Sequence, residues 1–122
     1  RHPLSNIISD STDVVGKPHP RLYGTFTRML GKYVRQRNAL KFEEAIHKMS
    51  GGPAQRLQLE GRGVVEVGAI ADLVVFDPKT VSDCADYAEP RRYSTGIVYV
   101  VVDGEVMIDQ GKLIQEIVVA PA

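Results

Sequence analysis

The stretch that decides the fold is "GIVYVVVDGEVMID", which runs from Gly96 to Asp109. Two apolar runs flank the pair Asp103-Gly104. An Asp-Gly pair between apolar runs is a strong signal for a two-residue turn that joins two antiparallel strands. The stretch therefore predicts a β-hairpin.

Further strands are predicted on both sides of this hairpin. Short apolar runs occur at 63–67 ("GVVEV"), 71–78 ("ADLVVFDP") and 112–120 ("KLIQEIVVA"). Such runs, bounded by turn residues, are typical of strands. The turns are expected at Val67-Gly68, Asp77-Pro78 and Gln110-Gly111. The polar segment from Lys79 to Thr95 is predicted to be a surface loop that crosses between strands.

The preceding part of the chain, from Thr25 to about Leu59, has a helical pattern instead. In "FTRMLGKYVRQRN" (26–38) the apolar residues recur at the 3.6-residue spacing of one helix face. Thr25 is the expected N-cap of this helix, and Gly31 is a weak position within it. The apolar stripe comprises Phe26, Met29, Leu30, Tyr33 and Val34.

Two shorter helices are predicted after the first. "KFEEAIHKMS" (41–50) places its apolar residues on one face. "GGPAQRLQLE" (51–60) carries Pro53 in its first turn, where the missing N–H costs nothing. Helices followed by antiparallel strands indicate an α+β fold, divided into residues 1–61 and 62–122.

Composition and charge exclude several classes of function. Lys plus Arg and Asp plus Glu number 15 each, so the net charge is zero and gives no electrostatic attraction to nucleic acid or an acidic membrane. No apolar stretch approaches the roughly 20 residues that span a bilayer. The single cysteine, Cys84, cannot form an internal disulfide, which favours a cytoplasmic protein.

Candidate functional residues lie near the start of the chain. Ile7-Ile8 predicts a short strand that ends at Asp10, and catalytic groups of α/β barrels lie at the C-terminal ends of strands. Arg21 follows the rigid pair His19-Pro20. The alternative is that Asp10 only forms a turn after the strand, that His19-Pro20 is only a bend, and that Arg21 is a surface cation.

The sequence shows no spacing typical of a metal site. His2, His19 and His47 are scattered, and neither His-x-His nor Cys-x-x-Cys occurs. Cys84 lies in a polar stretch without a neighbouring base, so it is not a candidate nucleophile. The chain alone is not expected to build a metal site.

Several stretches together resemble the C-terminal part of the N-acyl-D-amino-acid deacylases, or D-aminoacylases, of the amidohydrolase superfamily. "HPRLYGTFTRMLGKYVR" (19–35) is the most specific of them. The others are "SD" (9–10), "EEAIHKMSGGPAQRLQLEGRGVVEVGAIADLVVFDP" (43–78) and "GIVYVVVDGEVMIDQGK" (96–112). The resemblance covers nearly the whole chain up to about Lys112.

The resemblance implies a zinc-dependent hydrolase whose small-molecule substrate is an N-acyl-D-amino acid. Such enzymes fold as a (β/α)8 barrel plus a small β-domain, a β-sandwich built from strands of both chain ends. By this resemblance, residues 1–61 hold the last barrel strand and the helices after it. Residues 62–122 supply strands of the β-domain.

The resemblance also implies roles for individual residues. Asp10 is similar to the aspartate that ends the eighth barrel strand, touches the metal and shuttles a proton from the attacking water to the leaving amine. Arg21 is similar to the arginine that binds the α-carboxylate of the substrate, which suits a guanidinium that binds carboxylates with two parallel hydrogen bonds. His19, in the same motif, is assigned to substrate binding.

The sequence also departs from the family pattern. Ser11 stands where the family usually has Gly, and "SGGP" (50–53) replaces a Thr-x-x-Pro pattern. The tail "LIQEIVVAPA" (113–122) lacks the expected Gly- and Arg-rich ending.

The barrel strands that carry the metal-binding histidines have no counterpart in these 122 residues. A C-terminal segment of a longer hydrolase is therefore expected, with no turnover and no zinc on its own; the start at Arg1 rather than Met fits this interpretation and a free-standing module alike. Exposed strand edges predict a homo-oligomer. Two other interpretations stay open: a free-standing, non-catalytic α+β binding or oligomerisation module, and a structural remnant without activity.

Overall fold

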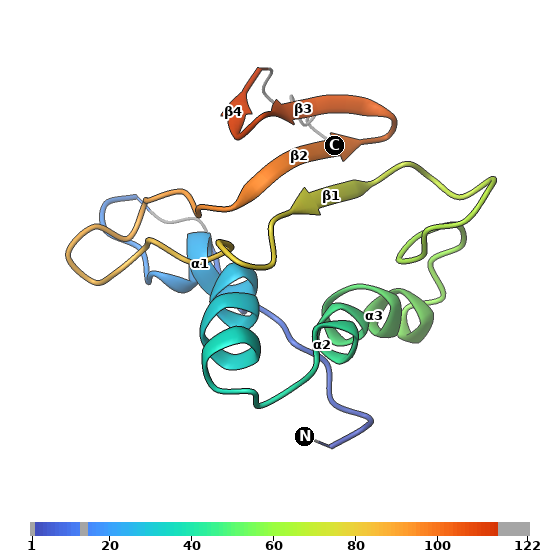
Figure 1. The fold of residues 1–122 in the computed structure, drawn as a ribbon, viewed down its shortest axis with the longest axis horizontal. Helices are drawn as coiled ribbons and strands as arrows, with labels where there is room; N and C mark the ends of the chain where they lie inside the picture. Colours follow the sequence, from blue (N-terminus) through green and yellow to red (C-terminus); the bar gives the residue numbers. More distant parts are fainter. Residues whose placement is uncertain (1, 13–14, 115–122) are drawn as a thin grey trace.

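The computed structural model describes residues 2–12 and 15–114, and it has the predicted α+β fold. A four-stranded sheet lies over a group of helices (Figure 1). The helices are α1 (Arg21–Arg28), the π-helix η1 (Met29–Gln36), α2 (Phe42–Met49) and α3 (Gly51–Arg56). The strands are β1 (Leu73–Phe76), β2 (Ile97–Val102), β3 (Glu105–Asp109) and β4 (Lys112–Leu113). In the described part of the chain, no helix has the length and apolar character needed to cross a membrane.

The sheet is an antiparallel meander in the order β1-β2-β3-β4. The predicted hairpin is confirmed, because Val102 pairs with Glu105 across a two-residue turn. Asp103 and Gly104 both have positive φ angles, 50° and 83°. This is the geometry of a type I′ turn, which matches the twist of the strands it joins.

Two strand predictions have other outcomes. The stretch 63–67 is not a strand: Val65 and Val67 are fully or almost fully exposed, so no sheet face covers them. Gly63 has a φ angle of 78°, and a Cβ there would lie 2.6 Å from the Cβ of Ala54. The backbone at Gly63 therefore packs closely against α3, and the stretch 63–67 forms no strand. Of the run 112–120, β4 occupies the first two residues, and 115–120 lie outside the described residues.

The first helix begins at Arg21, before the predicted N-cap Thr25. Pro20 is its N-cap, with a φ angle of −53° that is already helical. Thr25 is therefore not a cap; inside the helix its hydroxyl donates a hydrogen bond of 2.8 Å to the carbonyl of Arg21. The second and third helices are confirmed, with Pro53 in the first turn of α3.

The core joins the helices to the segment between β1 and β2. Its buried side chains are Leu30, Val34, Ala45 and Val81. Val81 is completely buried, so the segment 79–95 is not simply the surface loop that its polarity predicts. The carbonyl oxygen of Val81 accepts a hydrogen bond of 2.6 Å from Arg35. The buried side chain of Val81 thus holds the start of the polar segment 79–95 against the helices.

The predicted strand at Ile7-Ile8 is absent from the described residues. The segment runs along α2 instead, and the N–H of Ile7 donates to the carbonyl of Lys48 over 3.0 Å. Ile8 is 71% exposed. A strand needs a neighbouring strand to pair with, and the four-stranded sheet lies elsewhere (Figure 1).

Candidate functional site

The structure brings Asp10 and Arg21 together at the start of α1. The Arg21 Nη2 atom lies 3.5 Å from the Asp10 Oδ2 atom, and their side chains are 44% and 79% exposed. Asp10 has a φ angle of 47°, a conformation that is uncommon for residues other than glycine. An exposed ion pair adds little to stability. This one leaves both charged groups accessible to a ligand from solvent.

His19 contacts this site through the backbone of Arg21. The N–H of Arg21 donates a hydrogen bond of 3.0 Å to His19 Nδ1, so in the neutral ring the proton lies on Nε2. His19 Nε2 lies 2.9 Å from the hydroxyl oxygen of Tyr87, and the two rings meet edge to face. With this proton placement, His19 donates to Tyr87 and accepts from the start of α1.

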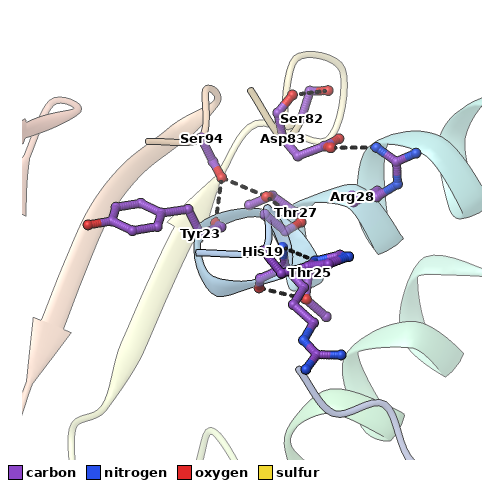
Figure 2. Close-up of polar contacts among 10 residues, drawn as sticks. His19, Tyr23, Thr25, Thr27, Arg28, Ser82, Asp83 and Ser94 are labelled. Carbon is purple, nitrogen blue, oxygen red and sulfur yellow. Dashed lines mark hydrogen bonds and ion pairs between the residues drawn. The ribbon is translucent and has the colours of Figure 1, made fainter. Parts of the chain in front are cut away.

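Other polar contacts attach α1 to the segment 79–95 (Figure 2). The hydroxyls of Thr27 and Ser94 lie 2.6 Å apart, and that of Ser94 also donates to the carbonyl of Tyr23 over 3.4 Å. Arg28 donates to the carboxylate of Asp83 over 2.8 Å, which raises the pKa of the guanidinium. These contacts fix the helix on which Arg21 lies.

These partners were not identified from the sequence. Tyr87 is 68 residues away from His19 along the chain, and Asp83 is 55 residues away from Arg28. Tyrosine and aspartate in a polar loop resemble ordinary surface residues. The sequence shows only that the segment 79–95 is polar and that the first helix is rich in arginine. Neither feature specifies which residues contact each other.

The described residues do not complete a metal site. Within 2–12 and 15–114, no group of three or more His, Cys, Asp or Glu side chains lies close enough to hold an ion. Zinc in proteins usually takes three or four such ligands. Asp10 offers one carboxylate, so these residues alone do not fit zinc.

Comparison with known proteins gives the class of this chain. Residues 8–108 match the Amidohydrolase family, and the chain belongs to this family. Within it, the chain is similar to two proteins of Alcaligenes xylosoxydans xylosoxydans. It is 49% identical to a D-aminoacylase over 88 residues, which are 72% of this chain and 18% of the relative. It is 45% identical to an N-acyl-D-glutamate deacylase over 104 residues, 85% of this chain and 21% of the relative.

A solved structure gives the same relationship in three dimensions. It is an N-acyl-D-glutamate deacylase from Bordetella bronchiseptica in complex with zinc and a phosphonate inhibitor that mimics the tetrahedral intermediate. The TM-score is 0.84 at 44% identity, over 87% of this chain and 22% of that one. The chain thus spans about a fifth of the length of the relatives that it matches. The resemblance to the deacylases is confirmed.

Proposed function

We propose that this chain forms the C-terminal part of a metal-dependent hydrolase that cleaves the amide bond of N-acyl-D-amino acids. The observation that carries the proposal is the pair of Asp10 and Arg21 at the start of α1, in a chain about 45% identical to deacylases. Residues 1–61 would end the barrel, and residues 62–122 would supply strands of a β-sandwich. The single cysteine supports a cytoplasmic location.

In this proposal Arg21 binds the α-carboxylate of the substrate. A guanidinium donates two parallel hydrogen bonds to a carboxylate, and such charge-assisted pairs are stronger than neutral hydrogen bonds. A substrate carboxylate competes with Asp10 for Arg21, so substrate binding releases the Asp10 carboxylate. His19 supports the binding site by accepting the Arg21 N–H.

Asp10 is proposed as the proton-transfer group. A free carboxylate accepts a proton from the water that attacks the amide carbonyl and delivers it to the nitrogen of the leaving amine. No three metal-ligating side chains lie together among the described residues. Zinc would therefore need ligands from the rest of the hydrolase in addition to Asp10. Asp10 is the ligand that this chain would add, and the chain alone is expected to be inactive.

The test is an Arg21→Lys variant of a complete hydrolase carrying this segment, with two substrates. Lysine keeps the charge and loses the two-pronged hydrogen bonding. KM should rise for the free-acid substrate and stay unchanged for the same substrate with its carboxylate amidated. Steady-state kinetics on the pair measures this. An equal loss on both substrates would show that Arg21 has a structural role and that the carboxylate assignment is wrong.

A further inference from the structure

Lys48, near the end of α2, is a buried charged residue that the proposed chemistry does not use. Its residue surface is 8% exposed. The Nζ atom donates hydrogen bonds of 2.7 Å to the carbonyls of His2 and Ser5, and one of 3.1 Å to the Ser5 hydroxyl. The Pro3 carbonyl lies 3.5 Å away. A buried lysine needs partners for its three N–H groups, and here the segment 2–5 supplies them.

The backbone of the same residue also holds this segment. The carbonyl of Lys48 accepts the N–H of Ile7 over 3.0 Å. The α2–α3 junction adds a close approach, because a Cβ on Gly52 would lie 2.8 Å from the side-chain oxygen of Asn6. The side chain and the backbone carbonyl of Lys48, together with the close packing at Gly52, therefore fix residues 2–7 against α2 and α3.

This attachment lies next to the candidate site. Ile7 is three residues before Asp10. Asp10 and its partner Arg21 belong to separate parts of the structure: Arg21 is in α1, whereas Asp10 follows the segment that Lys48 holds. The distance between the two charges thus depends on two independent attachments. A misplacement of about 1 Å of a reacting group can lower a rate by about 10²-fold.

We infer that Lys48 is a positioning residue for Asp10. By holding the segment 2–7 against α2, Lys48 places the Asp10 carboxylate next to Arg21. This inference rests on the proposed function for its catalytic consequence. Lys48 acts through the segment 2–7 and does not touch the substrate.

The kinetic test uses Lys48→Met in a complete hydrolase carrying this segment. Methionine keeps an unbranched apolar stem and loses all three donors. We expect kcat to fall roughly 10- to 100-fold. KM for the free-acid substrate should change less than about twofold, because Arg21 is held separately on α1. Lys48→Arg, which keeps the charge and the donors, should recover part of the lost kcat.

Met107→Ala is the matched control. Met107 is buried on β3, outside the segment 2–10 and the segment 79–95, so its truncation lowers the melting temperature through a cavity. It should leave kcat unchanged at a temperature where the protein stays folded. If Lys48→Met lowers only the melting temperature, as Met107→Ala does, and leaves kcat unchanged, the positioning role is wrong.

A second measurement follows the attachment in the 122-residue chain itself. Lys48→Met should speed hydrogen exchange of the Ile7 amide about tenfold or more, while amides of α1 keep their protection. Unchanged protection of Ile7 would overturn the inference. The proposed function fails separately, if Asp10→Asn and Arg21→Lys both leave turnover unchanged. If Asp10→Asn lowers kcat and Lys48→Met does not, only the inference about Lys48 fails.

Discussion

Asp10 and Arg21 lie 3.5 Å apart in an exposed pair that adds little to stability, and the proposed role of Asp10 is proton transfer. Asp10→Asn keeps the shape of the side chain and removes the group that accepts a proton. In a complete hydrolase carrying this segment, kcat should fall roughly 10²- to 10⁴-fold, the span usual for a general acid–base group.

KM should change little in the same variant, because the exposed Asp10–Arg21 pair is weak and Arg21, which binds the substrate carboxylate, is unaltered. Steady-state kinetics with a free-acid substrate measures both constants. A kcat within about twofold of the wild-type value would remove Asp10 from the mechanism.

The sequence indicates the candidate residues Asp10 and Arg21, which lie in one local stretch, and it does not indicate the partners that the structure gives to this region. Asp10 and Arg21 are 11 positions apart in a segment with recognisable residue types. The contact of His19 with Tyr87 depends on how the segment 79–95 folds over α1. Long-range contacts of this kind come from packing, which leaves no local pattern.

Among the elements, η1 packs more closely on its neighbour than its helical pattern indicates. A Cβ on Gly31 would lie 2.8 Å from the carbonyl oxygen of Val81, a backbone atom that side-chain motion cannot move away. Gly→Ala inside a helix usually stabilises by about 0.5–1 kcal/mol. Here the clash should reverse the sign, and Gly31→Ala should destabilise the chain.

Thermal or denaturant unfolding of Gly31→Ala checks this sign. Gly24→Ala, on α1, is the control, because its Cβ would meet the Asp83 side chain at 3.1 Å rather than a backbone atom. The control should lose less stability than Gly31→Ala. A stabilised Gly31→Ala variant would mean that η1 and Val81 are further apart in solution.

Elements set by local chemistry were predicted well, and elements set by distant partners were not. The Asp103-Gly104 hairpin needs only its turn and its two apolar runs, and it is confirmed. "GVVEV" and Ile7-Ile8 have apolar residues typical of strands. They form no strand because neither has a neighbouring strand to pair with among the described residues.

At the scale of the whole molecule, the positions of the metal-ligating side chains predict whether the isolated chain binds zinc. The described residues bring no three metal-ligating side chains together. The isolated chain should therefore retain no stoichiometric zinc after dialysis. Elemental analysis tests this. About one tightly bound zinc per chain would contradict the prediction and point to ligands contributed by more than one copy.

The exposed apolar surface of the whole molecule predicts self-association. An open groove between the helices and the sheet is lined by apolar side chains that include Phe26, Ile46, Leu73 and Val74. Val74 is on β1, at one edge of the sheet, and is 57% exposed. An apolar edge strand pairs readily with another chain, so the isolated chain should be a dimer or larger.

Light scattering on the wild-type chain and two lysine variants tests where the contact lies. Val74→Lys places a charge on the edge strand and should shift the chain toward the monomer, since charged side chains block edge pairing. Val67→Lys is the matched control: Val67 is fully exposed in a turn outside the groove, and its replacement should leave association unchanged. A wild-type monomer at working concentration would contradict the prediction outright. Equal effects of the two variants would place the contact away from β1.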